Sequence, residues 1–184
     1  MNIIIQKPEI SKREEIHALF GTVIHRTLKL EGVGDDYELT AELIADQQEL
    51  IDLCFETDGE ECFFLTAVHE GKTVGTICRR ECSDIIKDCA DRDVSGVQEI
   101  GSVYILPQFQ GKGIARLLLN AMYITLIAQG YDEFWLDSGY EIAKNVWAKV
   151  LGPPSIIMKD YWAEGVDHHL WHKKLDEVSI EFDI

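Results

Sequence analysis

The spacing of apolar residues along the chain predicts alternating strands and helices. Four stretches repeat an apolar side chain every three or four residues, the spacing of one helical face: residues 11–30, 40–56, 114–128 and 141–151. Seven shorter stretches are rich in β-branched and aromatic residues: 2–6, 62–69, 73–80, 97–105, 132–137, 155–162 and 167–175. The chain is therefore predicted to be an α/β protein of element order β-α-α-β-β-β-α-β-α-β-β.

Local signals place the ends of these elements. Ser11 and Glu14 have the spacing of a capping box, and Thr40 is expected to cap the second helix. Pro107 closes the strand before it, because proline has no amide hydrogen to donate to a ladder. The polar stretch 81–96 shows no period and is predicted to be a loop. The first helix is expected to bury Ile16, Leu19, Phe20, Val23, Ile24 and Leu28, and the third Ile114, Leu117, Leu118, Ala121, Ile124 and Ala128.

Composition narrows the choice of partners. The 184 residues, 46% of them apolar, fit one domain, expected over residues 1–176 with a tail at 177–184. The chain contains 17 Lys and Arg residues and 33 Asp and Glu residues, which gives a formal net charge of −16. A surface this acidic repels phosphate backbones and anionic lipids, so neither nucleic acid nor a membrane is expected as a partner. A small or cationic substrate suits this field better.

Cysteines and histidines give no metal signature. The five cysteines lack regular spacing, which favours a reducing, cytoplasmic compartment over a disulfide framework. No run of about 18 apolar residues or basic leader is found, so we expect neither a membrane span nor export. Alternation places His168 and His172 on one face of the last strand and His169 on the other, so no metal site is expected.

The strongest chemical signal is the glycine-rich turn before the helix at 114–128. Its sequence, Gln110-Gly-Lys-Gly-Ile-Ala115, lets the backbone approach a ligand, and the helix that follows presents free amides suited to a phosphate. The spacing excludes a P-loop and a G-x-G-x-x-G fingerprint, since Arg116 stands where the last glycine would be. The remaining pattern, Q-x-x-G-x-A after V-Y-I-L-P, strongly resembles motif A of the GNAT superfamily of acetyl-CoA-dependent N-acetyltransferases.

This resemblance implies the GNAT acyl-CoA N-acyltransferase fold, a mixed central sheet flanked by helices whose fourth and fifth strands splay apart around pantetheine. It also implies acetyl-CoA as the co-substrate, with no metal. Backbone groups of the turn would bind the pyrophosphate, Lys112 and Arg116 would add charge or be solvated, and the Ile105 amide would face the oxyanion. The cofactor-binding residues expected on this basis are Val103, Ile105, Gln110, Gly111, Lys112, Gly113, Ile114, Ala115, Arg116 and Asn145.

The resemblance is less complete for the catalytic groups. Several GNAT enzymes use a glutamate on the strand before the turn to take the amine proton, and Glu99 lies near the matching place. We expect Glu99 to be the base; pairing with the substrate ammonium or a surface position are the alternatives. Many members carry N-x-x-A-x-x-x-Y on a later helix, and here Asn145 begins the motif but Gly152 replaces its tyrosine. Tyr140, Tyr161 or water could act as the acid, and the sequence does not choose.

The resemblance implies an N-acetyltransferase that moves acetyl from acetyl-CoA to a primary amine of a small acceptor by direct attack in a ternary complex. The acidic composition favours a cationic acceptor: a polyamine, an aminoglycoside-like amine or a cationic amino acid. Two alternatives stay open: transfer of another acyl group, and a CoA-binding regulator of this fold without turnover, which would fit the missing tyrosine. A homodimer also stays open, and the acceptor is not legible in the chain.

Overall fold

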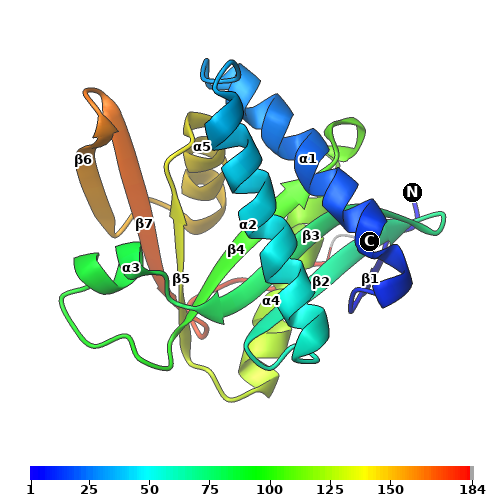
Figure 1. The fold of residues 1–184 in the computed structure, drawn as a ribbon. Helices are drawn as coiled ribbons and strands as arrows, with labels where there is room; N and C mark the ends of the chain where they lie inside the picture. Colours follow the sequence, from blue (N-terminus) through cyan, green and yellow to red (C-terminus); the bar gives the residue numbers. More distant parts are fainter. Residues whose placement is uncertain (183–184) are drawn as a thin grey trace. The chain divides into compact units, whose positions relative to one another are not determined.

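A computed structural model describes residues 1–182 (Figure 1). Its seven-stranded sheet has the order β1-β2-β3-β4-β5-β7-β6. The strands are β1 (Ile4–Gln6), β2 (Cys62–His69), β3 (Lys72–Glu81), β4 (Gln98–Ile105), β5 (Glu133–Ser138), β6 (Ile156–Ala163) and β7 (Val166–Lys174). The helices are α1 (Arg13–Leu30), α2 (Tyr37–Glu56), α3 (Asp84–Cys89), α4 (Ile114–Ala128) and α5 (Glu141–Leu151), with short 3-10 turns η1 (Ile10–Lys12) and η2 (Pro107–Phe109).

The sheet is mixed, as predicted. β1 pairs antiparallel with β2, and β5 pairs antiparallel with β7, whose other edge carries β6. β4 and β5 are parallel, with Gln98 opposite Phe134 and Glu99 opposite Trp135. The predicted order of strands and helices is confirmed, with α3 as the one α-helix added to it among the described residues.

Contacts divide the chain into two compact units. Unit 1 comprises Met1–Arg79, Ser102–Thr125 and the chain from Glu181, and unit 2 comprises Arg80–Gly101 and Leu126–Ile180. The chain passes from one unit to the other inside β3, β4 and α4.

In unit 1 helices cover both faces of the sheet. α1 and α2 lie side by side (Figure 1), and the Phe20 ring on α1 packs 6.4 Å from Phe64 and 5.5 Å from Tyr104. On the opposite face α4 packs against the sheet: a Cβ on Gly75 would lie 3.4 Å from the Leu118 side chain of α4. Burial on both faces explains why β2 is apolar without alternation.

In unit 2 the β6–β7 hairpin extends the sheet beyond β5, and α5 contacts β7 (Figure 1). The stretch 81–96 is not the loop that the sequence predicts, because α3 forms within it and packs as part of a core. The helix α3 is too short for its apolar residues to show a helical period. Its position is therefore set by packing and could not be predicted from the sequence pattern. The buried cluster comprises Cys82, Ile86, Val94, Trp135 and Leu170.

The predicted helix caps are wrong. Ser11 lies in the 3-10 turn η1, α1 begins at Arg13, and Lys12 at its cap makes no side-chain capping bond. Asp36 caps α2 by accepting the Leu39 amide at 2.9 Å, while Thr40 lies one turn inside the helix. The helix α1 begins after the predicted cap Ser11, and α2 begins before the predicted cap Thr40. The type of side chain alone does not determine the residue at which a helix begins.

Buried faces are predicted well for α1 and poorly for α4. All six expected residues of α1 are buried. In α4, however, Ile124 is 47% exposed and Ala128 is exposed, whereas Leu119, Met122 and Tyr123 are buried. Almost every position of α4 is apolar, so its sequence contains little periodicity from which to find the inward face.

The tail forms no strand over residues 177–182, and Asn120 on α4 donates to the Glu181 carbonyl at 2.6 Å. The last two residues of the predicted tail lie outside the described part of the chain.

Candidate functional site

The glycine-rich turn lies in unit 1, between η2 and α4. Gly111 and Gly113 have φ angles of +71° and +78°, in the left-handed region that favours glycine. A Cβ built on either residue would meet no atom within 4 Å. Residues 111–113 are exposed, whereas the Ile114 side chain is 1% exposed and fixes the start of the helix in the core. The turn therefore presents an open backbone surface on a rigid base.

The helix start supplies the electrostatics of this turn. Leu117 N–H donates to the Gly113 carbonyl at 3.1 Å, which makes Gly113 the cap. The amides of Ile114 and Ala115 then belong to the first turn, whose N–H groups have no acceptor within the helix. They add to the positive end of the helix dipole. These are the features of a phosphate site, so the residues present fit a diphosphate ligand.

Two basic residues lie in the turn and directly after it, Lys112 and Arg116. The Lys112 ammonium lies 5.2 Å from the centroid of the Phe109 ring, a cation–π distance. Arg116 is exposed in the first turn of α4. Both positions add positive charge beside the open amides.

The strand that leads to the turn contains a backbone irregularity. Ser102 has a φ of +51°, which is uncommon for a residue with a side chain. Its carbonyl accepts the Thr76 hydroxyl at 2.8 Å, and its own hydroxyl lies 2.7 Å from Gln47 Oε1. Hydrogen bonds from β3 and α2 thus hold the strand in this shape. Val103 and Ile105 follow it, and Gln110 Nε2 donates to the Ile105 carbonyl at 3.0 Å, which ties the strand to the turn.

Glu99 lies in unit 2 and is 1% exposed. Arg80 Nη2 donates to its Oε1 at 2.9 Å, and the Ser83 backbone N–H donates to its Oε2 at 2.7 Å. Both carboxylate oxygens therefore have donors, and Arg80 balances the charge. A carboxylate can accept a proton from an amine, but both oxygens of Glu99 already accept hydrogen bonds, so a substrate group would have to replace one of these donors.

The sequence gives little indication of the two partners of Glu99. Arg80 ends a predicted strand, and Ser83 lies in the stretch predicted to be a loop. Ser83 directly precedes Asp84 and Ile85, and this N-cap pattern could have indicated the start of α3. The contacts span 19 and 16 residues, so no local pattern predicts them.

A second ionic group holds the segment after α3 to the sheet of unit 2. Arg92 lies 2.8 Å and His172 lies 2.7 Å from the Glu133 carboxylate, and the His172 ring stacks on Trp135 at 4.8 Å. Burial alone would raise the pKa of Glu133, but the hydrogen bonds from Arg92 and His172 lower it overall. Glu133 is therefore an anion that anchors this segment.

Asn145 and the candidate acids are also in unit 2. The Asn145 side chain is exposed and donates to the Glu141 carbonyl of its own helix at 2.9 Å. Gly152, which stands where many family members have a tyrosine, ends α5 with a φ of +79°. Glycine adopts this left-handed conformation more readily than residues with a side chain. Tyr140 stands at the N-cap of α5, and Tyr161 is 41% exposed on β6.

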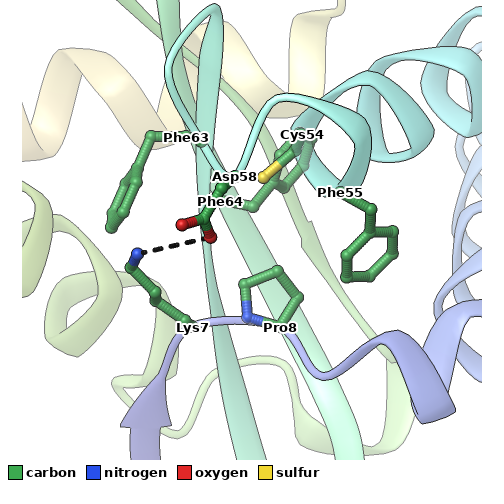
Figure 2. A pocket seen from close by; sticks show the side chains of 8 residues that line it. Lys7, Pro8, Cys54, Phe55, Asp58, Phe63 and Phe64 are labelled. Carbon is green, nitrogen blue, oxygen red and sulfur yellow. Dashed lines mark ion pairs between the residues drawn. The ribbon is translucent and has the colours of Figure 1, made fainter.

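Figure 2 shows a pocket of unit 1 that is unsuited to a cofactor. Its volume of about 60 Å³ corresponds to roughly two water molecules. Lys7 and Asp58 face each other across it at 4.0 Å. The lining residues are Lys7, Pro8, Cys54, Phe55, Asp58, Gly59, Phe63 and Phe64, none of them in the turn at 110–115.

The unit 2 thiol of Cys82 is buried. Burial raises the pKa of Cys82 to about 12, so this thiol stays protonated at neutral pH. Within residues 1–182 no group of three His, Cys, Asp or Glu side chains is arranged to hold a metal ion.

Comparison with known proteins gives a family match and several related structures. The model of the acetyltransferase (GNAT) family matches residues 30–152. No curated protein matches the chain. Over the described residues, no helix combines the length and apolar character needed to cross a membrane.

Solved structures share the fold at low sequence identity. A PaiA N-acetyltransferase from Thermoplasma acidophilum in complex with coenzyme A is 18% identical, with a TM-score of 0.69 over 95% of this chain and 99% of that chain. A ribosomal-protein-alanine N-acetyltransferase from Brucella melitensis is 14% identical, with a TM-score of 0.66 over 93% and 99%. A spermidine N-acetyltransferase SpeG chimera from Vibrio cholerae and hSSAT is 15% identical, with a TM-score of 0.63 over 96% and 98%.

Proposed function

Because the chain belongs to the acetyltransferase (GNAT) family, we propose that this acyltransferase moves acetyl from acetyl-CoA to a primary amine of a small cationic acceptor by direct attack in a ternary complex. The observation that carries the proposal is the turn at 110–115, with its two exposed, left-handed glycines directly before the start of α4. One related structure contains coenzyme A, which supports the same ligand here.

The turn and the strand before it would bind the co-substrate. Backbone amides from Gln110 to Ala115 would hold the diphosphate, with Lys112 and Arg116 adding charge. Main-chain groups of Val103 and Ile105 would pair with pantetheine, with the Ile105 amide directed at the developing oxyanion. Asn145 would contribute a further contact if its side chain leaves the Glu141 carbonyl.

Glu99 would take the proton. In the transfer, the amine nitrogen forms a bond to the acetyl carbon, the carbon–sulfur bond breaks, the amine proton passes to Glu99, and the thiolate leaves to be protonated. The present hydrogen bonds of Glu99 mean that an acceptor amine must replace Arg80 or the Ser83 amide as its neighbour.

The relatives leave the acceptor class open, because one is described as acting on a ribosomal protein and another on spermidine. We place a small cationic amine first because the chain has a formal net charge of −16. Transfer of a different acyl group is the second candidate, and a group such as succinyl would require a cationic acyl pocket.

The test combines two measurements on the whole chain. Calorimetry should detect binding of coenzyme A, and incubation with acetyl-CoA and a panel of amines should release free thiol with at least one cationic member. Binding without thiol release from any amine would favour a regulator of the same fold. Absence of any binding at millimolar coenzyme A would overturn the proposal as a whole.

A further inference from the structure

A hydrogen-bonded row in unit 2 joins side chains from three strands. Trp162 on β6 donates its indole Nε1–H to His168 Nδ1 at 3.1 Å. His168 on β7 places Nε2 3.1 Å from Asp137 Oδ2 on β5. His168 is 4% exposed, so the centre of the row is buried, while Trp162 at one end is exposed and Asp137 at the other is partly exposed.

The row fixes the protonation of the imidazole. An indole N–H can only donate, so His168 Nδ1 must accept and carries no proton. The ring proton of His168 is therefore on Nε2, which donates to Asp137. The imidazole is neutral and leaves the Asp137 charge unbalanced. Within residues 1–182, His168 is the hydrogen-bonding partner of the Asp137 carboxylate, which has no Lys or Arg partner and keeps 22% of its side chain exposed.

A backbone irregularity brings two aromatic rings to the same place. On a regular strand, the adjacent residues Tyr161 and Trp162 would point to opposite faces. Asp160 before them has a φ of +54°, and the β6–β7 register shifts between Met158 and Ala163. Both rings consequently lie 5.6 Å from the His168 ring and 4.8 Å from each other. They remain 41% and 57% exposed, so their faces are available to a ligand.

Gly139 makes room for this arrangement. A Cβ at this position would lie 2.6 Å from Trp162 Nε1 and 3.2 Å from His168 Nδ1, directly at their hydrogen bond. The absence of a side chain at Gly139 and the bulge at Asp160 are two separate features that support one cluster. Irregular backbone of this kind is often retained for function.

We propose that Asp137, Tyr161 and Trp162 bind an alkylammonium group of the acceptor, the one that is not acetylated. This rests on the proposed function and adds the substrate class, an alkyl diamine or polyamine. The unbalanced Asp137 carboxylate supplies a charge-assisted acceptor for N–H groups. The exposed rings supply apolar and cation–π contacts for the methylene chain and its charge. An anionic group would be repelled by Asp137, and a neutral alcohol would lack the ionic and cation–π parts of this contact.

The test is calorimetry of 1,4-diaminobutane binding to the whole chain, with and without saturating coenzyme A. Asp137→Asn keeps an oxygen for the His168 N–H but removes the charge, and it should weaken binding about tenfold or more. Asp132→Asn is the matched control, since Asp132 is exposed next to the start of the same strand. It should bind the diamine like the wild type, and 1,4-butanediol should not bind.

Three outcomes would overturn the assignment: no saturable diamine binding by the wild type, wild-type affinity in Asp137→Asn, or equal weakening in Asp132→Asn, which would indicate only a general field. Thermal unfolding of each variant verifies that it is folded. Because the readout is diamine binding and not turnover, it is separable from the proposed function, which fails if coenzyme A does not bind.

Trp162→Phe provides a second, independent measurement. The variant keeps an aromatic ring but removes the donor to His168 Nδ1, so the imidazole can take a proton there and balance Asp137. Diamine affinity should fall several-fold although Asp137 is unchanged. Wild-type affinity in this variant would contradict the role assigned to the neutral imidazole.

Discussion

Residues 110–113 of the glycine-rich turn are exposed, whereas Glu99 is 1% exposed and its carboxylate is held by Arg80 and the Ser83 amide. The turn is made by consecutive residues of unit 1. The Glu99 centre, in unit 2, needs a segment 16 to 19 residues away to fold back over it. A ligand can therefore reach the turn directly, while the setting of Glu99 depends on how well the α3 segment packs.

The largest effect is expected from a substitution that disturbs the packing of α3. Ile86→Ala removes a fully buried side chain from the core of unit 2 and should lower the free energy of unfolding by about 3 kcal/mol. Ile85→Ala on the same helix is the control, since Ile85 is only partly buried and should cost less than half as much. Urea denaturation measures both. Equal losses would mean that the α3 segment contributes no specific core.

Next in size is the loss of the proposed base. Glu99→Gln should reduce kcat about 100-fold while leaving coenzyme A affinity unchanged. The new amide also places a donor against Arg80 or the Ser83 N–H, so a stability loss of about 1–3 kcal/mol is expected in thermal unfolding.

Arg80→Gln separates catalysis from structure at Glu99, because it removes the ion pair and keeps the carboxylate. If Glu99 serves only as a partner for Arg80, both variants should lose the same activity. If Glu99 is the base, only Glu99→Gln should lose the acidic limb of the pH profile of kcat/KM, which reports protonation of a base.

A smaller effect is expected at the turn. Gly113→Ala places a side chain on a left-handed backbone at the start of α4, and it should weaken coenzyme A binding about tenfold by calorimetry. Gly71→Ala is a matched control in the same unit, since Gly71 has a φ of +76° and equally open surroundings. Both should lose similar stability. Equal loss of coenzyme A affinity would remove the turn from the binding site.

The smallest effect concerns acid stability in unit 2. The pKa of Glu133 is lowered in the folded protein, so its ionised form stabilises the fold. This contribution is complete above the pKa of an unfolded glutamate, about 4.3, and is lost as the pH falls through the lower folded value. Glu133→Gln should cost about 1 kcal/mol at pH 6 and almost nothing at pH 2 in urea denaturation. A constant difference across this range would contradict the assignment.

The local sequence was sufficient to predict those features that depend on one continuous segment. The turn could be predicted because its glycines, the strand before it and the helix after it are consecutive in the sequence. The buried face of α1 could be predicted because its apolar residues have a clear helical period. In α4 the same reasoning failed on the inward face, since an almost wholly apolar helix has no contrast between its faces.

What the chain determined by itself is the order of its strands and helices and the glycine turn, because these depend on backbone preferences and on the periodicity of neighbouring residues. Tertiary structure alone decided that 81–96 packs as part of a core, that Arg80 and Ser83 hold Glu99, and that Trp162 and Asp137 meet at His168. Those contacts join residues from separate elements, and the bulge at Asp160 even reverses the alternation that the sequence implies. Side-chain direction and long-range pairing are set by packing of the whole unit, and no local pattern contains them.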